Sequence, residues 1–313
     1  MKIRPDALIF LGVDVRPQVS GFFVWGCAPL ILLQCCCSSC SDNLSAASTS
    51  FHLYASNLLF LPCMENFSKD GVLAMPLSRR AISIGFLLNF TWEHDAWFLP
   101  TYQVVQNFII PSTAELKKPY VNLLDPELHG QVKVFISHAW SNPFGLLVAA
   151  ARKFISDCDS KVSKHDCFFW LDIFAITQHG GLFQAEELAQ LEDTVLEADT
   201  TLVVLDPSCG IPLQRIWCIF EIFITIEQGT YGKLKVRVGD VSMGGDFLPC
   251  NDGEVLRRLA ASVNIEGANA TVPSDSERIL ARIATMTSAM ESGRKGIKEV
   301  DRKLQRAVRQ GWT

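Results

Sequence analysis

The stretch VKVFISHAW at residues 132–140 begins a repeating pattern that decides the fold class of this chain. Its first five residues are a β-branched and aromatic run of strand length, and segments of helical length separate it from later runs of the same kind. Those runs are CFFWL at 167–171, TLVVL at 201–205 and KLKVRV at 233–238. Strands that alternate with helices in this way predict a parallel sheet covered by helices on both faces, which is a doubly wound α/β domain.

Two of the connecting helices have clear boundaries in the sequence. The first follows Ser141-Asn142-Pro143, in which a capping residue precedes a proline at the first helical turn. Its predicted apolar face consists of Leu146, Leu147, Ala150 and Phe154. The other helix occupies about 213–228 and is predicted to end at Gly229, because glycine commonly terminates helices.

A further helix, predicted at about 184–198, has an acidic side. Its inward positions are Leu188, Leu191 and Val195. Its outward positions are Glu186, Glu187, Glu192 and Asp193. This amphipathic pattern places all four carboxylates in solvent.

The chain divides into four predicted parts. Residues 1–75 form a low-charge leader, and residues 76–130 form a lead-in that packs on the next domain. The lead-in is dense in aromatic residues and contains a short helix after Thr101. Residues 131–250 form the α/β domain, and residues 251–313 form a C-terminal extension of three short helices. The last helix has an apolar stripe of Ile297, Val300, Leu304 and Val308.

The composition restricts the class of protein. A chain of 313 residues that is 49% hydrophobic can bury a large core, which excludes a wholly disordered protein. A formal net charge of −5 gives no general attraction to nucleic acid, so no nucleic-acid partner is expected. The cysteines are irregularly spaced and odd in number, at 11, which favours a reducing compartment and hence the cytoplasm.

The leader has several open interpretations. Residues 17–41 carry no formal charge and are long enough to cross a bilayer, so they predict possible membrane contact or an anchor. The cysteines between Cys35 and Cys40 would then be candidates for palmitoylation, whereas the lone CxxC at Cys37–Cys40 is weak evidence for a metal site. The alternatives are a disordered extension, or a protein that starts near Met64 or Met75. No metal is predicted anywhere in the chain.

The carboxyl ends of the predicted strands carry polar and aromatic residues. Ser137, His138 and Trp140 follow the first strand, and Asp172 follows the second. Ligands of doubly wound sheets bind beyond these ends. The chain contains neither GxGxxG nor GxxxxGK[ST], so the phosphate cradles of Rossmann oxidoreductases and P-loop enzymes are both missing.

Nucleophilic chemistry at these strand ends has weak support. Ser137 and His138 are neighbours in sequence, and neighbouring strand residues point to opposite faces of a sheet. They would therefore not easily act as a nucleophile and its base. The favoured interpretation is that both residues only shape the loop at the end of the strand. Cys218 lies on an apolar helix with no basic neighbour to activate it, which favours a buried structural thiol.

Glu221 is the most informative acidic residue. It lies in QRIWCIFEIFIT at 214–225 and is the only acid between Asp206 and Glu227. Arg215 is six residues earlier, which is not helix-neighbour spacing, so no local ion pair is expected. Glu221 is therefore either a functional carboxylate in an apolar pocket or a partly exposed acid paired with a distant arginine.

Four segments in this order resemble a TIR-type domain. They are FISHAW at 135–140, FFWLDIF at 168–174, LVVLDP at 202–207 and RIWCIFEI at 215–222. They resemble in particular the divergent TIR-like proteins of plants, algae and protists that carry a "SHAW" first strand. The resemblance covers residues 130–240 well and 80–310 loosely. Ser141-Asn142 and the ITQHGG segment at 176–181 depart from the usual TIR pattern.

The resemblance implies a flavodoxin-like, five-stranded parallel sheet and one of two activities. Some TIR domains cleave NAD at the nicotinamide–ribose bond with a Glu on the third helix, a position that Glu221 matches. Ser137, His138, Asp172 and the ring faces of Trp140 or Trp217 would then contact the NAD substrate, with no cofactor required. Other TIR domains are non-catalytic adaptors, which implies self-association, or pairing with other TIR-like domains, through the loop at 173–185 and the surface helices. A degenerate TIR fold with another small ligand is a third possibility.

Overall fold

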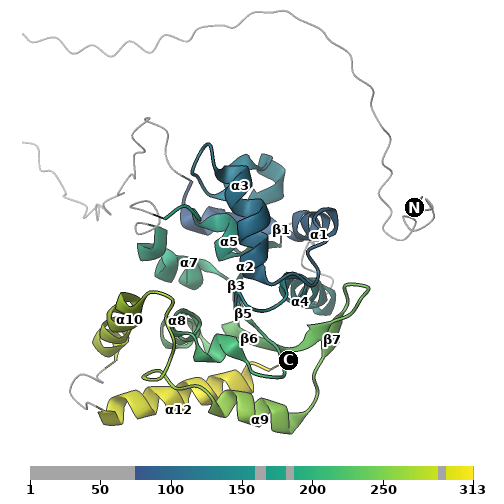
Figure 1. Cartoon of the computed structure of the whole chain (residues 1–313). Helices are drawn as coiled ribbons and strands as arrows, with labels where there is room; N and C mark the ends of the chain where they lie inside the picture. The colour runs from purple at the N-terminus through teal and green to yellow at the C-terminus, as the bar shows by residue number, and fades with distance from the viewer. Residues whose placement is uncertain (1–74, 159–166, 181–186, 288–293, 313) are drawn as a thin grey trace, which may run out of the picture. The chain divides into compact units, whose positions relative to one another are not determined.

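The structure is a computed structural model that describes residues 75–158, 167–180, 187–287 and 294–312 (Figure 1). Its described strands form one sheet of seven strands in the order β2-β1-β4-β3-β5-β6-β7. The strands are β1 Ala81–Ser83, β2 His129–Gly130, β3 Val134–Ser137, β4 Phe168–Trp170, β5 Thr200–Leu205, β6 Leu234–Val241 and β7 Phe247–Pro249. All four strands expected from the apolar runs are therefore present, and the fold is of the α/β class.

The sheet is mixed, whereas a wholly parallel sheet of five strands was expected. The four central strands β4, β3, β5 and β6 pair in parallel, but β1 pairs antiparallel with both β2 and β4. At the other edge β7 pairs antiparallel with β6 after a tight turn at residues 242–246. Gly245 adopts φ +77 in this turn, and a Cβ there would lie 2.6 Å from the Trp97 ring, so only glycine fits. The expectation was wrong at the edges because short strands of two or three residues carry too little pattern to be read from sequence.

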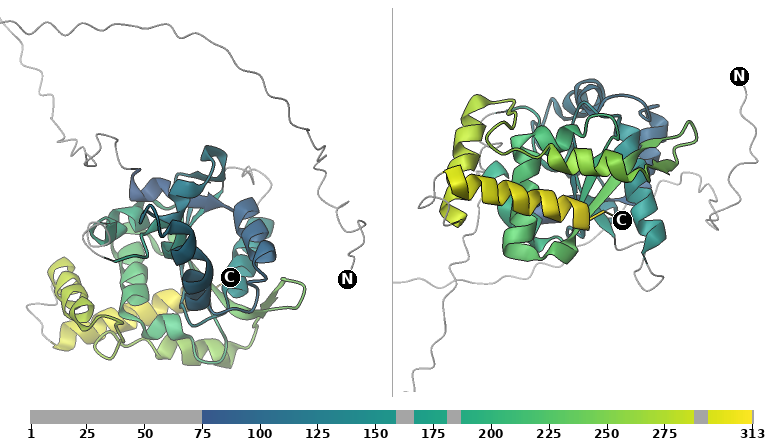
Figure 2. Two further views of the ribbon diagram at one scale, coloured as in Figure 1. Left: turned by 45° about the horizontal axis from the view of Figure 1, so that its top comes forward. Right: turned by 90° about the horizontal axis from the view of Figure 1, so that it is seen from below.

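Helices cover both faces of the sheet. On one face lie α1 Ile84–Glu93, α4 Phe144–Asp157 and the continuous helical segment from α2 Thr101–Val104 through the π-turn at Val105–Ile109 to α3 Ile110–Thr113. On the other face lie α7 Leu191–Glu197, α8 Ile216–Ile224, α9 Gly253–Ala261, α10 Pro273–Met286 and α12 Arg294–Gln310. In the right-hand view of Figure 2, α12 and α9 lie side by side on the side of the molecule that faces the viewer.

Shorter helical segments complete the described elements. A four-residue helix, α5 Asp172–Ala175, follows β4, and a π-turn at Thr225–Gly229 extends α8. The 3₁₀ turns are Leu77–Arg79, Tyr120–Leu123, Pro126–Leu128, Ile211–Gln214 and Tyr231–Lys233.

The central strand β3 shows why these residues form a doubly covered sheet. All four of its residues are buried, with Phe135 in the core beneath α8 and its neighbours Val134 and Ile136 in the core beneath α4. Successive side chains of a strand point to opposite faces, so an unbroken apolar run requires helices on both sides.

The predicted helices are largely confirmed, with two differences in detail. The helical segment that includes α8 ends at Gly229, and the C-terminal extension forms α9, α10 and α12 as expected. Helix α4 begins directly after Pro143, but no side chain caps its first turn. A break at Arg215, which is extended with φ −102 and ψ 130, delays α8 to Ile216.

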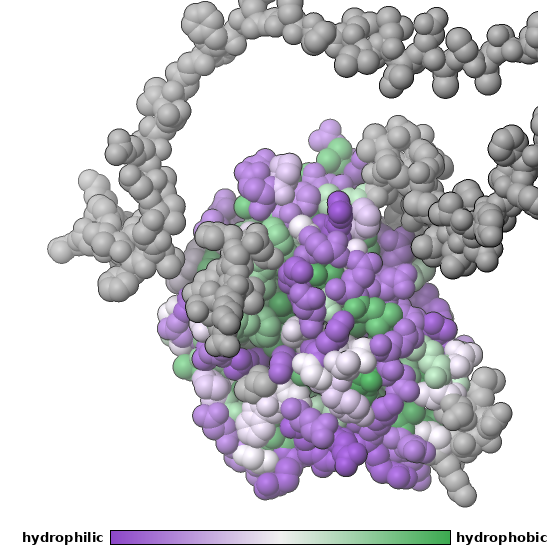
Figure 3. Space-filling view, turned by 180° about the vertical axis from the view of Figure 1, so that it is seen from behind, coloured by the Kyte–Doolittle hydropathy of each residue, from purple (hydrophilic) through white to green (hydrophobic). Residues whose placement is uncertain are grey.

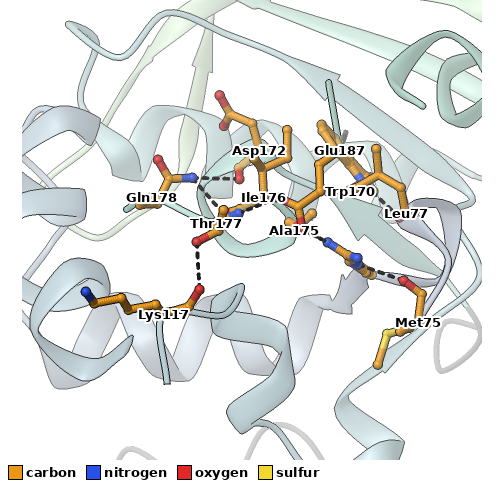
Figure 4. A network of polar contacts seen from close by, with 11 residues as sticks. Met75, Leu77, Lys117, Trp170, Asp172, Ala175, Ile176, Thr177, Gln178 and Glu187 are labelled. Atoms are coloured by element: carbon orange, nitrogen blue, oxygen red, sulfur yellow. Dashed lines mark hydrogen bonds and ion pairs between the residues drawn. The ribbon is translucent and has the colours of Figure 1, made fainter. Parts of the chain in front are cut away.

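Glu187 corrects the expected outward position of this carboxylate. It is 8% exposed and forms an ion pair with Arg80, which is equally buried. Its second carboxylate oxygen accepts a hydrogen bond of 2.9 Å from the Thr177 N–H, and Arg80 also donates to the Ala175 carbonyl (Figure 4). Helical periodicity predicts a solvent-exposed Glu187, which is wrong because periodicity cannot reveal Arg80, a partner 107 residues away in the sequence.

The lead-in at 76–130 is built into the sheet and packs on the segment after β4. It supplies β1 and β2, and its Phe86, Phe90 and Tyr120 rings surround Phe174 at centroid distances of 5.2–5.4 Å. The Trp170 indole N–H donates to the Leu77 carbonyl at 3.0 Å. These contacts fix the start of the loop that follows β4.

Within the described residues, no helix is both long and apolar enough to cross a membrane. The surface seen from behind is mostly hydrophilic, with scattered apolar positions (Figure 3). The stretch at 17–41, with its predicted membrane contact, lies outside the described residues.

Removal of Arg80 should destabilise the fold strongly, because Glu187 would keep a buried charge without its partner. We expect Arg80→Met to lower the free energy of unfolding by about 3 kcal/mol in urea titrations. The double variant Arg80→Met/Glu187→Leu should recover most of this loss. Equal stability of wild type and the single variant would show that the pair is not needed.

Candidate functional site

The sheet brings five sequence-predicted residues to one edge. Ser137 ends β3 and His138 and Trp140 follow it, while Asp172 is the first residue of α5 after β4. Glu221 approaches from α8, which covers the same sheet. The strands are parallel, so their carboxyl ends meet, and this places residues from three segments in one neighbourhood.

Asp172 links the carboxyl ends of β3 and β4. Its Oδ2 accepts a hydrogen bond of 2.8 Å from the Trp140 indole N–H, and its Oδ1 lies 3.8 Å from His138 Nε2. The Gln178 amide donates to the Asp172 carbonyl at 3.1 Å. Asp172 thereby orients Trp140 and ties the loop after β4 to the end of β3.

Glu221 carries a carboxyl group with a strongly perturbed pKa. Burial, with a smaller contribution from the Asp172 carboxylate, raises the pKa of Glu221 from its ordinary value of 4.5 to about 8. The Ser137 hydroxyl and the positive charge of Arg215 oppose this shift. At pH 7 only about one molecule in ten carries an ionised Glu221.

His138 and Cys218 lie beside this carboxyl group. Burial lowers the pKa of His138, against the opposing effect of Asp172, so the imidazole is neutral at pH 7. The Cys218 thiol donates to the His138 carbonyl at 3.4 Å, and burial raises the pKa of this thiol. Cys218 is therefore a protonated structural thiol, which the sequence had favoured.

Unpartnered polar atoms gather at this point. Seven buried side-chain polar atoms lack a hydrogen-bond partner among the described residues, and four belong to this site. Those four are Ser137 Oγ, His138 Nε2, Asp172 Oδ1 and Glu221 Oε2. None of them makes a hydrogen bond of good geometry, although the Ser137 hydroxyl lies near enough to the Glu221 carboxyl group to lower its pKa. Buried polar groups are otherwise nearly always paired, so their convergence indicates a place built to receive polar atoms of a ligand.

Trp217 is placed differently from the other predicted residues. It lies one turn before Glu221 on α8, but its indole N–H donates to Asp275 Oδ2 at 2.9 Å, and the Arg278 guanidinium lies 5.3 Å from the centre of its ring. Within the described residues no hydrogen bond joins Trp217 to the strand-end cluster. The Trp217 side chain therefore contacts the C-terminal extension, through Asp275 and Arg278.

Arg215 is a further residue of this neighbourhood. Its spacing from Glu221 predicts no local ion pair, yet its charge acts on His138, Cys218 and Glu221 together. Its extended conformation before α8 allows this, and no periodic pattern could have revealed it.

The loop after β4 is held firmly over its described part, up to Gly180. The Thr177 hydroxyl donates to the Lys117 carbonyl at 3.2 Å (Figure 4). Thr113 Oγ1 lies 2.8 Å from His179 Nε2. Both partners belong to the lead-in. The rest of the loop predicted as an association surface, at 181–185, lies outside the described residues.

The described residues contain no group of three or more His, Cys, Asp or Glu side chains arranged to hold a metal ion. The site instead offers carboxyl groups, a neutral imidazole, a hydroxyl and a nearby guanidinium. These groups can bind hydroxyl groups and stabilise a developing positive charge.

Comparison of the chain with family models, with curated proteins and with solved structures gave no match.

The raised pKa of Glu221 makes stability depend on pH. The folded state keeps a proton that the unfolded state releases above pH 4.5, so the contribution of this group to stability falls as pH rises toward 8. Relative to Glu221→Gln, the wild type should lose at most about 1.4 kcal/mol of unfolding free energy per pH unit between about pH 5 and 8. Urea titrations at several pH values measure this difference, and parallel curves for the two proteins would contradict the burial of Glu221.

Proposed function

We propose that this protein is a TIR-like domain that cleaves the nicotinamide–ribose bond of NAD, with Glu221 as the essential carboxylate. The observation that carries the proposal is the convergence of Glu221 with Ser137, His138 and Asp172, each with an unpartnered buried polar atom. This cluster lies where a doubly wound sheet binds its ligands.

The order of the parallel strands supports a flavodoxin-like core. Counted along the chain from β3, the four parallel strands lie in the order second, first, third, fourth. This matches the first four strands of the flavodoxin-like order. The antiparallel β7 occupies the edge where such a fold carries a fifth parallel strand.

The chemistry needs little beyond a placed carboxylate. Departure of neutral nicotinamide leaves positive charge on the ribose, and a nearby carboxylate stabilises that oxocarbenium-like state. Water then bonds to the ribose carbon and releases a proton, which is hydrolysis, or the adenine ring of the same molecule bonds there, which is cyclisation. The cationic ring of bound NAD would favour ionisation of Glu221 and so offset the effect of burial. The neutral His138 and the Ser137 hydroxyl can hold ribose hydroxyl groups. Trp140, oriented by Asp172, offers a ring face for the nicotinamide.

A non-catalytic adaptor is the second candidate. It is favoured by the departures ITQHGG and Ser141-Asn142 from the usual TIR pattern. The anchoring of Thr177 and His179 to the lead-in counts against free movement of the described part of the proposed association loop.

The direct test is nicotinamide release from NAD by the purified full-length protein. Wild type should release nicotinamide, and Glu221→Gln should lower kcat by at least about a hundredfold, because it removes the charge that stabilises the transition state. Glu227→Gln is the matched control: Glu227 lies in the π-turn after α8, pairs with Lys303 and should retain activity.

The outcomes separate the two candidates. Absence of turnover by wild type, in dilute and in crowded or assembled preparations, would reject the enzyme and leave the adaptor. Equal turnover by wild type and Glu221→Gln would reject the residue assignment alone.

The pH profile gives a further prediction. Since the pKa of Glu221 is about 8, kcat/KM should rise about tenfold per pH unit below pH 8 and then level off. Asp172→Asn should move the midpoint to lower pH, because the Asp172 carboxylate raises the pKa of Glu221. A flat profile from pH 6 to 9 in wild type would contradict a role for ionised Glu221 in the free enzyme.

A further inference from the structure

Arg215 borders a hollow that the C-terminal extension helps to enclose. The hollow has a volume of about 270 Å³ and is lined by Ile211, Gln214, Arg215, Asn269, Ala270 and Thr271. Main-chain hydrogen bonds fix its two walls: the Ile216 N–H donates to the Asn269 carbonyl at 3.0 Å, and the Asn269 N–H donates to the Gln214 carbonyl at 2.8 Å. We call this feature the Arg215 hollow.

The guanidinium of Arg215 has no hydrogen-bond or ion-pair partner among the described residues, although the residue is only partly exposed. The two most buried arginines differ, since Arg80 pairs with Glu187 and Arg237 donates to Asp157 at 2.6 Å. A partly buried guanidinium without an ion-pair partner can form charge-assisted hydrogen bonds with an anionic ligand.

The surroundings of the hollow also favour an anion. No side chain caps the N-terminus of α8, a helix of nine residues, so its positive dipole end lies beside Arg215. Asn269 and Thr271 are exposed on the opposite wall and can donate hydrogen bonds. The Gln214 amide is already committed to the Cys209 carbonyl at 2.8 Å. The hollow therefore offers donors and positive charge without a lining carboxylate.

Arg215 belongs to the hollow and also influences the strand-end cluster. Its charge lowers the pKa of both His138 and Glu221. Arg215 directly precedes Ile216, the first residue of α8, and Glu221 lies five residues further on, which is about 7.5 Å along the helix axis. That spacing suits a ligand whose ribose reaches Glu221 and whose phosphate groups reach Arg215.

We propose that Arg215 and its hollow bind the diphosphate of the dinucleotide whose ribose contacts Glu221. The identity of this ligand rests on the proposed function, whereas affinity for a diphosphate rests on the Arg215 hollow itself. The planar guanidinium suits two-point binding of phosphate oxygens, and the segment 269–271 closes the far side. The C-terminal extension would thus form part of the substrate site.

Binding of inorganic pyrophosphate to the full-length protein tests the hollow without any turnover. Isothermal titration calorimetry should show binding to wild type and at least about tenfold weaker binding to Arg215→Met, because one arginine–phosphate contact is lost. Arg257→Met is the matched control, since Arg257 is exposed, pairs with Glu254 and lines a different hollow. It should bind as wild type does.

A second pair of variants guards against misfolding of Arg215→Met. Thr271 is exposed, so Thr271→Glu should fold normally and weaken pyrophosphate binding by repulsion, while Thr271→Gln should not. Unchanged binding in both Arg215→Met and Thr271→Glu, or no binding to wild type at millimolar pyrophosphate, would overturn the proposal.

The substrate series separates this proposal from the proposed function. If NAD is cleaved, Arg215→Met should raise KM for NAD about tenfold while leaving cleavage of nicotinamide riboside, which lacks the diphosphate, unchanged. An equal loss with both substrates would show that Arg215 acts only on the reacting group and would overturn the diphosphate assignment. If NAD is not cleaved, the pyrophosphate titrations decide the proposal alone.

Discussion

The burial of β3 on both faces is the constraint on which the rest of the structure depends. Every residue of Val134–Ser137 is withdrawn from solvent, so helices must cover the sheet on both sides. A strand of this kind can change direction only at its ends, where the chain has to leave a closed apolar core. The polar residues Ser137 and His138 stand at that exit, and their burial follows from the position of the strand.

The lead-in and the C-terminal extension each complete a different side of this core. The lead-in adds β1 and β2 to the sheet, packs its aromatic rings on Phe174 and holds the loop after β4 through Thr113 and Lys117. The extension packs on α8, binds Trp217 through Asp275 and pairs Asn269 with the chain around Arg215. Both segments thus contact residues next to the strand ends, so the site depends on residues far outside 131–250.

The electrostatics of the site follow from this enclosure. Two carboxyl groups, Glu221 and Asp172, approach one another in a region where burial disfavours charge, and the pKa of Glu221 rises as a result. Asp172 accepts a hydrogen bond from Trp140 and retains some exposure to solvent. Among the charged groups that act on Glu221, Arg215 is the one cation. A ligand with a positive ring and a negative diphosphate would match this arrangement at both ends, which joins the two proposals.

The role expected for Glu221 came from the resemblance to TIR-type domains. The sequence by itself determined the α/β class, the four central strands, most helix boundaries and the place of Ser137, His138, Trp140 and Asp172 at the strand ends. These follow from local periodicity and from the rule that parallel strands end together. Only the tertiary structure decided that Glu187 pairs with Arg80 and that the strands at the sheet edges are antiparallel. It also decided that Trp217 donates to Asp275 of α10 and that Arg215 lines the Arg215 hollow. The physical reason is that these features arise from polar contacts and short pairings between distant segments, whose partners leave no periodic pattern in the local sequence.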